Sequence, residues 1–126
     1  MPLVIDTDVI IDYLRDRPEA VSYLENLTDF LLVSAITVAE LYAGVRDGAE
    51  RTALDSFIQA FEIVAVDEEI AVKGGLYRRD YYKSHNTGLA DALIAATADT
   101  KNAELVTLNK KHYPMLSNVI VPYQKP

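Results

Sequence analysis

The amino-acid sequence predicts an α/β fold in which a parallel sheet is flanked by helices. Short apolar runs alternate with longer helical patterns along the chain, as is typical of strands joined by crossover helices. Half of the 126 residues are hydrophobic and a quarter are charged, which is a globular composition. We therefore expect one domain over residues 1–126.

Five apolar runs are the candidates for the strands of this sheet. They are short and rich in Val, Ile and Leu, as strands buried on both faces are. The sequence predicts a mostly parallel sheet of four to five strands drawn from residues 3–5, 31–33, 63–66, 105–107 and 119–121.

Six helical stretches lie between these runs. Thr7 or Asp8 is expected to cap the first helix, and Pro18 suits the first turn of the second. Asp67 is expected to cap a long helix that runs to residue 83, and Gly88 precedes an Ala-rich helix. The other helices are predicted at residues 9–14, 18–27, 36–45, 50–61 and 89–100.

Composition excludes several classes of site. The chain has no cysteine, so it holds no disulfide framework, thiolate zinc site or Cys nucleophile, and we expect a cytoplasmic protein. It shows no apolar run of membrane-spanning length, so we expect no membrane partner. The net charge of −7 gives no bulk attraction for nucleic acid, so local cations would have to supply it.

Three carboxylates stand in apolar surroundings. Asp6 directly follows the first strand run, Glu40 lies in the third helical stretch, and Asp91 lies in the first turn of the Ala-rich helix. Each has a purely structural alternative: Asp6 as acceptor of backbone N–H bonds, Asp91 as complement to the helix N-terminus, and Glu40 pointing outward. Since all three follow predicted strand ends, one parallel sheet would bring them to a common crevice.

Oxygen ligands without Cys or clustered His favour hard cations, here Mg²⁺ or Mn²⁺. Such a site activates water and neutralises phosphate charge, which is the chemistry of phosphodiester hydrolysis. The sequence thus favours a metal-dependent enzyme acting on nucleic acid.

Basic side chains supply candidate contacts to RNA. One predicted helix interleaves cations with Tyr77, Tyr81 and Tyr82, a pattern suited to stacking on single-stranded bases. The alternative is a solvated helix face with tyrosines in the core or at an interface. The candidate RNA-binding residues are Arg15, Arg46, Arg78, Arg79 and Lys83.

Four segments resemble the motifs of PIN domains, especially VapC-type toxins of toxin–antitoxin pairs. They are residues 3–14 (LVIDTDVIIDYL), 34–41 (SAITVAEL), 89–98 (LADALIAATA) and 105–109 (LVTLN), in the order of the family. The resemblance implies a three-layer α/β/α sandwich and an Mg²⁺- or Mn²⁺-dependent endoribonuclease. It also implies a homodimer inhibited by a small VapB-like antitoxin that brings a basic or amphipathic tail.

The resemblance also implies roles for individual residues. Asp6, Glu40 and Asp91 match the acidic metal ligands, while hydroxyls such as those of Thr7 and Thr107 commonly line the site. Asp8 is expected to cap the helix or support the ligands. The family often has a fourth acid where this chain has Asn109, which makes Asn109 a weaker metal ligand and a second metal less certain.

Two other functions stay open at the level of sequence. Asp6-Thr7-Asp8 after an apolar strand resembles the nucleophile motif of haloacid-dehalogenase phosphatases, although no later acidic pair follows. A PIN-like domain that has lost metal affinity would serve as a non-catalytic binding module. Asp12 and Asp99 are expected to be surface charges, and His112 a surface or turn residue.

Overall fold

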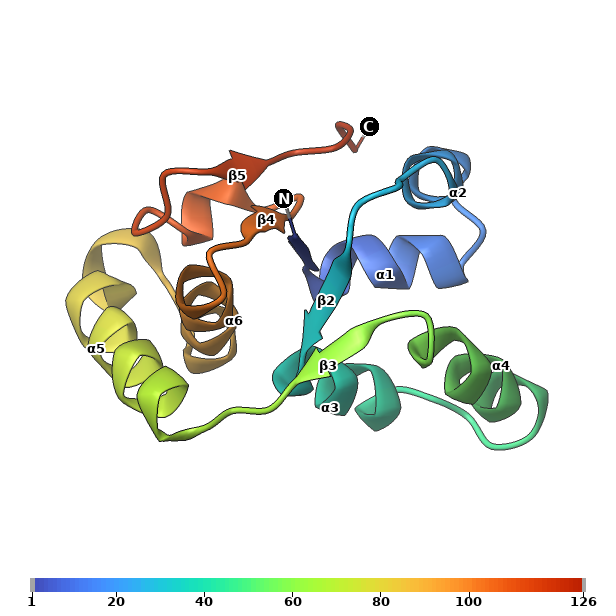
Figure 1. Ribbon diagram of the computed structural model, residues 1–126, viewed down its shortest axis with the longest axis horizontal. Helices are drawn as coiled ribbons and strands as arrows, with labels where there is room; N and C mark the ends of the chain where they lie inside the picture. Colours follow the sequence, from blue (N-terminus) through green and yellow to red (C-terminus); the bar gives the residue numbers. More distant parts are fainter. Residues whose placement is uncertain (1, 126) are drawn as a thin grey trace.

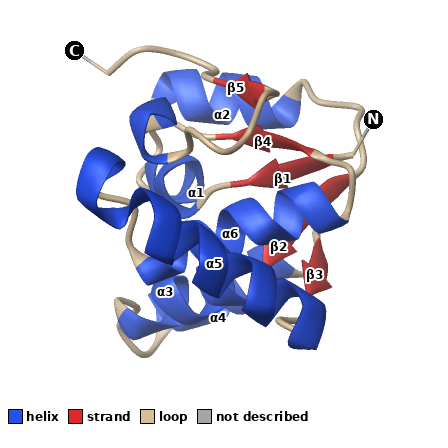
Figure 2. Cartoon of the chain, turned by 90° about the vertical axis from the view of Figure 1, so that its left-hand side faces the viewer, coloured by secondary structure: helices blue, strands red, loops and turns tan. Residues whose placement is uncertain are grey.

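The computed structural model describes residues 2–125 and places five strands in one parallel sheet. The strand order is β3-β2-β1-β4-β5, which Figure 2 shows from the side of the covering helices. This confirms the predicted parallel sheet. The strands are β1 (Leu3–Ile5), β2 (Leu31–Ser34), β3 (Glu62–Val64), β4 (Glu104–Val106) and β5 (Val119–Ile120).

The central strand is β1, which is buried along its whole length. Its Leu3 aligns with Leu31 of β2 on one side and with Glu104 of β4 on the other. A strand covered on both faces needs apolar side chains at every position, which explains the uninterrupted run of residues 3–5.

All six predicted helices are present, with ends that differ by a few residues. A 3₁₀ turn, η1 (Lys110–His112), follows β4. The helices are α1 (Thr7–Leu14), α2 (Pro18–Glu25), α3 (Ala35–Ala43), α4 (Ala49–Ile58), α5 (Glu68–His85) and α6 (Leu89–Thr100).

The prediction for the cap of the first helix was wrong. Asp6 is the N-cap of α1, with extended backbone angles and a side chain that accepts a hydrogen bond from the Thr7 amide. Because α1 begins directly after β1, Thr7 and Asp8 already lie inside the helix. The predicted cap of α5 is confirmed, since Asp67 accepts a hydrogen bond from the amide of Ile70 at 2.9 Å.

The side chains of the sheet divide the core into two layers, as Figure 1 shows by the helices on either side. Leu3 and Ile5 pack with residues of α1, α2, α3 and α4, whereas Val4 packs with residues of α5 and α6. Successive strand residues point to opposite faces, so one short strand serves both layers. The predicted three-layer α/β/α sandwich is confirmed.

One prediction about charge was also wrong. Asp12 is not a surface charge: it is only 4% exposed and accepts a hydrogen bond from the Tyr123 hydroxyl at 2.9 Å. The Lys125 ammonium lies 3.2 Å from its other oxygen. Asp12 therefore holds the C-terminal segment against α1. Asp99 is exposed as expected and pairs with Lys73 at 2.9 Å.

Within residues 2–125, the helices are all too short or too polar to cross a bilayer.

Candidate functional site

The side chain of Asp6 lies at the centre of the candidate site, at the carboxyl end of the central strand. It is 5% exposed, and three donors surround its carboxylate. Oδ1 accepts the Thr7 amide at 2.7 Å, and Oδ2 accepts the hydroxyls of Thr107 at 2.7 Å and Tyr113 at 2.8 Å. The predicted position of Thr107 beside the acids is thus observed.

Ionising the buried carboxyl group of Asp6 costs free energy. Burial, and next the nearby carboxylate of Asp8, raise the pKa of Asp6 to about 7, although the donors from Thr107, Tyr113 and Thr7 oppose the shift. A strongly shifted carboxyl group at a strand end is a mark of a functional site.

Thr7 connects Asp6 to Glu40. Its hydroxyl lies 2.7 Å from Oε1 of Glu40 and 3.0 Å from the hydroxyl of Thr37, both on α3. Glu40 itself is exposed, so its free oxygen faces solvent or a ligand. The Ser34 cap on the Ile36 amide starts α3 directly after β2, which sets Glu40 on the second turn beside Asp6.

Tyr113 connects Asp6 to Asp91. Its hydroxyl, which donates to Asp6, also lies 3.3 Å from Oδ1 of Asp91 in the first turn of α6. Tyr113 is 1% exposed, and burial, with the charges of Asp6 and Asp91, raises the pKa of its phenol, which therefore stays protonated. Tyr113 was not anticipated from the sequence, because it follows a short turn with no periodic pattern that would show it as buried.

Asp8 and Asn109 form a second polar pair beside Asp6. Oδ2 of Asp8 accepts the Asn109 side-chain amide at 2.9 Å and the Leu108 amide at 3.1 Å. Burial is the first cause that raises the pKa of Asp8, while the backbone bond from Leu108 opposes it. Asp8 is therefore not a cap of α1 but a carboxylate that fixes the loop after β4, next to the position where the resemblance places a fourth acid.

The carboxylate oxygens at this edge of the sheet suit a hard cation. Oδ1 of Asp8 is buried without a hydrogen-bond partner, and Asp6, Glu40 and Asp91 add carboxylate oxygens without sulfur or imidazole. In the described part of the chain, no three acidic or His side chains are already gathered as a ready-made ligand cluster. Mg²⁺ usually takes only one or two carboxylates and keeps several waters, so this arrangement fits it.

His112 lies at the edge of the site. Its Nδ1 is 3.3 Å from the backbone oxygen of Asn86 and 3.9 Å from Oδ2 of Asp91. It belongs to the η1 turn, as expected, and closes the rim beside Asp91.

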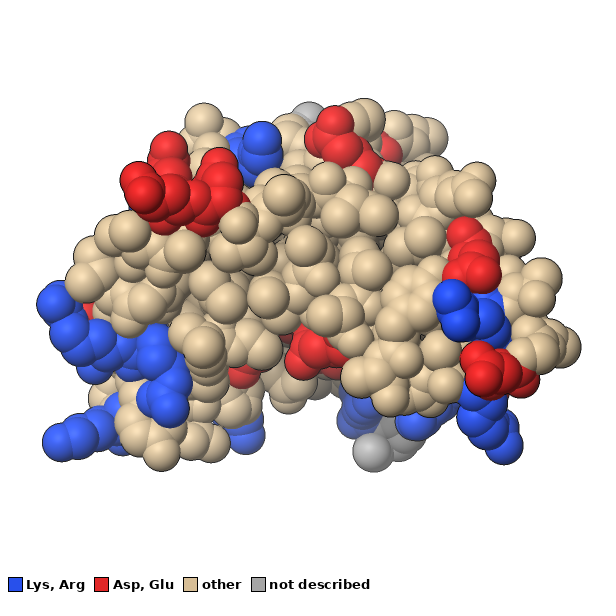
Figure 3. Space-filling model, turned by 90° about the horizontal axis from the view of Figure 1, so that it is seen from below, with Lys and Arg blue, Asp and Glu red and all other residues tan. Residues whose placement is uncertain are grey.

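The candidate RNA-binding residues are not gathered in one patch. Figure 3 shows Lys and Arg side chains on both sides of a hollow, over α5 on the left and at the lower right, with acidic atoms between them. Arg46 pairs with Glu50 at 3.2 Å and Arg79 with Asp80 at 2.8 Å. The guanidinium of Arg78 lies 3.7 Å over the ring of Tyr82, so the predicted alternation of cations and tyrosines brings one such pair together.

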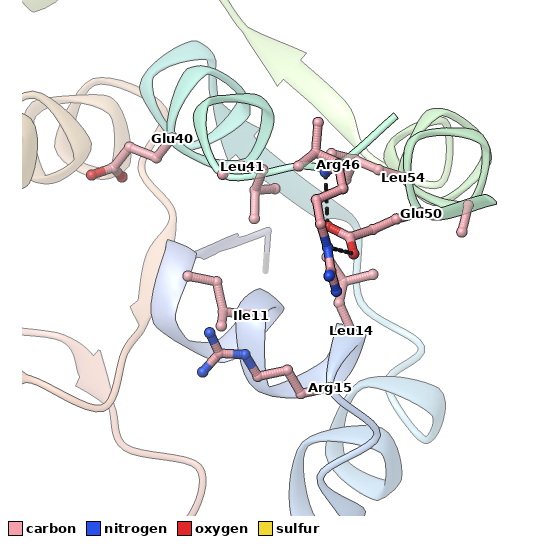
Figure 4. A pocket seen from close by; sticks show the side chains of 11 residues that line it. Ile11, Leu14, Arg15, Glu40, Leu41, Arg46, Glu50 and Leu54 are labelled. Atoms are coloured by element: carbon pink, nitrogen blue, oxygen red, sulfur yellow. Dashed lines mark hydrogen bonds and ion pairs between the residues drawn. The ribbon is translucent and has the colours of Figure 1, made fainter. Parts of the chain in front are cut away.

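A pocket of about 430 Å³ opens between α1, α3 and α4, next to Glu40. Figure 4 shows an apolar lining that includes Ile11, Leu14 and Leu54, with charged groups at the rim. The rim residues are Arg15, Glu40, Arg46 and Glu50.

Comparison with known proteins gives close relatives over nearly the full chain. Ribonuclease VapC19 of Mycobacterium tuberculosis is 39% identical over 125 residues, covering 95% of this chain and 98% of that protein. Ribonuclease VapC10 of the same organism is 37% identical over 127 residues, covering 98% of this chain and 95% of that protein.

Solved structures agree with this result. A chain of a toxin–antitoxin complex from Klebsiella pneumoniae superposes with a TM-score of 0.85 at 28% identity, covering 98% of this chain and 99% of that chain. The family model described as PIN domain matches residues 3–115, most of the chain. The chain therefore belongs to the PIN domain family.

Proposed function

We propose that residues 1–126 form a single PIN-like domain that acts as an Mg²⁺- or Mn²⁺-dependent endoribonuclease, the cytoplasmic toxin of a type II toxin–antitoxin pair. The observation that carries the proposal is the linkage of Asp6, Glu40 and Asp91 in a member of this family: the Thr7 amide and hydroxyl join Asp6 to Glu40, and the Tyr113 hydroxyl joins Asp6 to Asp91. Relatives that match nearly the full chain are named ribonucleases, which supports RNA as the substrate.

Each acid has a distinct role in this proposal. Asp6 and Asp91 hold the cation, which when bound supplies a more acidic water and shields the charge of the phosphate. Glu40, held by the Thr7 hydroxyl and open to solvent, orients the attacking water or ligates the cation. Asn109, a weaker ligand, contributes its side-chain oxygen because its amide nitrogen is engaged by Asp8.

The candidate contacts to RNA lie on two parts of the molecule. Lys83 and Arg78 of α5 offer charge and a stacked aromatic pair, and Arg15 and Arg46 offer charge at the rim of the pocket beside Glu40. Arg79 remains a candidate contact to RNA, although its guanidinium forms an ion pair with Asp80. Local cations of this kind offset the net charge of −7.

The test is cleavage of total cellular RNA with Mg²⁺ or Mn²⁺, comparing the wild type with Asp6→Asn and Asp99→Asn. Asp6→Asn is expected to abolish cleavage, whereas Asp99→Asn, an exposed acid on the far end of α6, keeps it. Equal cleavage by the wild type and Asp6→Asn would remove the proposal.

The products give a second, independent readout. Attack by water on phosphorus leaves a 5′-phosphate and a 3′-hydroxyl, which end-labelling with and without phosphatase distinguishes. A 2′,3′-cyclic phosphate would instead require attack by the ribose hydroxyl and would contradict the metal-dependent route.

The pocket beside Glu40 supports the antitoxin as a partner. An amphipathic segment would place apolar side chains on Ile11 and Leu14 and a basic side chain toward Glu40, close to the acids. A basic group in that place would compete with the cation and RNA and so would inhibit cleavage. The exposed Val72 and Leu76 on α5 support a homodimer through that helix.

Leu14→Glu tests this partner site, because Leu14 lines the pocket and is 38% exposed. We expect the variant to lose co-purification with the proposed antitoxin, whereas Val72→Glu on α5 keeps it. Retention by both variants would place the partner elsewhere.

The family assignment favours this function over the phosphatase alternative. Asp8, which would have to act as its acid/base, is instead engaged by Leu108 and Asn109. The binding-module alternative differs only in metal affinity, so calorimetry with Mn²⁺ on the folded protein separates it from the enzyme.

A further inference from the structure

Among the described contacts, the Tyr113 hydroxyl is the one side-chain group that itself touches two of the three proposed catalytic acids; Thr7 also joins two of them, but through its backbone amide and its hydroxyl. Tyr113 directly follows η1, 107 residues from Asp6 and 22 from Asp91, and is packed with Ile94, Ala95 and Leu105 in the core on the α5–α6 side of the sheet. A hydroxyl fixed on such a buried ring has little freedom to move away from Asp6 and Asp91.

The hydrogen bonds around Asp6 leave a restricted set of free acceptor positions. A carboxylate has about four lone-pair positions, two on each oxygen. Oδ2 of Asp6 uses both, for Thr107 at 2.7 Å and Tyr113 at 2.8 Å, whereas Oδ1 uses one for the Thr7 amide. With these bonds kept, Asp6 can offer a cation one further position, on Oδ1.

The contact with Asp91 is of a different kind. A phenol has one hydrogen, and its 2.8 Å contact with Asp6 is shorter than its 3.3 Å contact with Asp91. Tyr113 therefore donates its hydrogen mainly to Asp6 and only weakly to Asp91, and because both carboxylates lie against the same hydroxyl, that hydroxyl sets how far apart they stand.

We propose that Tyr113 is a positioning residue of the metal site: its hydroxyl orients Asp6 to bind a divalent cation through Oδ1 alone and sets the spacing between Asp6 and Asp91. The inference rests on the proposed function, because it assumes that these acids bind a cation. It adds to the four sequence motifs a residue that none of them contains.

The test is the affinity for Mn²⁺ of Tyr113→Phe, which removes only the hydroxyl. Groups that orient metal ligands typically contribute about 10–100-fold to metal affinity, so we expect Kd from calorimetry to rise by about that factor. Cleavage by the variant is expected to recover at saturating Mn²⁺, because the acids themselves are intact. Thermal unfolding in EDTA checks that the variant is folded.

The matched control is Tyr77→Phe. The Tyr77 hydroxyl also donates to an Asp of α6, Oδ2 of Asp99 at 2.8 Å, but at the other end of the helix. This variant is expected to bind Mn²⁺ as the wild type does. If Tyr113→Phe does not fold, Tyr113→Met fills the same space with a more adaptable side chain.

The outcomes separate this inference from the proposed function. Unchanged or tighter Mn²⁺ binding by Tyr113→Phe, with normal binding by the wild type, overturns the role of Tyr113 alone. No Mn²⁺ binding by the wild type overturns both. An equal loss in Tyr77→Phe would show a general effect of removing a hydroxyl and would also overturn the positioning role.

Discussion

At the scale of single residues, Asp6 shows how the fold and the site make opposite demands. As the N-cap of α1 it stabilises the helix, but it also places a carboxylate in the core beside Asp8. Three hydrogen bonds offset part of the cost of burying it, and a pKa of about 7 shows that they do not offset all of it. A bound cation would offset the rest of the cost of burying this carboxylate.

The stability of the metal-free protein should therefore depend on pH. Between the ordinary pKa of 3.8 and about 7, folded Asp6 binds a proton that the unfolded chain has released. More protons bound in the folded state means that the free energy of unfolding falls as pH rises through this interval and levels off above it. Asp8, whose pKa burial also raises, adds in the same direction.

Asp6→Asn removes part of this dependence. In EDTA we expect its free energy of unfolding to exceed that of the wild type by about 1–3 kcal/mol at high pH, with less difference at low pH. Urea unfolding at about pH 5.5 and about pH 8 measures this. A wild-type stability that increases over the same interval would contradict the raised pKa.

Residues 12 and 113 mark the limit of reasoning from local sequence. Asp12 looks like an ordinary helix charge, but Tyr123 and Lys125 arrive from the other end of the chain to bind it. Tyr113 looks like an ordinary turn residue, but the loop after β4 places it between two acids. Neither contact leaves a pattern in neighbouring residues.

At the scale of elements, the packing of α6 between the sheet and α5 fixes the position of Asp91. Ala92, Ala95 and Ala96 are buried, and the small side chains let the helix lie close to the strands. On the opposite side, Gly74 of α5 meets Leu93 so closely that it has no room for a side chain. This contact holds the helix whose first turn carries Asp91.

Gly74→Ala tests that packing. The added methyl group would lie 2.6 Å from Cδ2 and 3.2 Å from Cα of Leu93, so we expect a loss of about 1–3 kcal/mol in the free energy of unfolding. Urea unfolding of the purified variant measures the change.

Gly75→Ala is the control on the same helix. Its added methyl group meets open space, so better helix propensity should stabilise the protein by about 0.5–1 kcal/mol. If both variants were stabilised, the close approach of α5 to Leu93 would not limit the packing.

At the scale of the whole molecule, RNA binding depends on where the Lys and Arg side chains lie. The chain carries 19 acidic and 12 basic residues, so RNA must be drawn by local charge. Arg51 pairs with Asp47 and Asp55, whereas no ion pair is found for Lys83 in the described residues. Lys83 on α5 is therefore more available to phosphate than Arg51 on α4.

Salt dependence of RNA binding should report these contacts. In an Asp6→Asn background, Lys83→Ala and Arg78→Ala are each expected to reduce the log–log slope of affinity against salt by about 0.7, the value for one contact to a single strand. Arg51→Ala should leave the slope unchanged. Filter binding of an RNA oligonucleotide over a salt series measures it, and equal slopes for all variants would exclude α5 from the RNA path.

The sequence by itself determined the elements and the acids. Short continuous apolar runs are typical of strands buried on both faces, and parallel strands joined by helices bring Asp6, Glu40 and Asp91 to one edge. Tertiary structure alone decided that Asp8 binds Asn109 and that Tyr113 joins two acids. The physical reason is range: strand and helix patterns repeat within a few residues, whereas these contacts join side chains up to 107 residues apart, whose positions depend on how the layers pack.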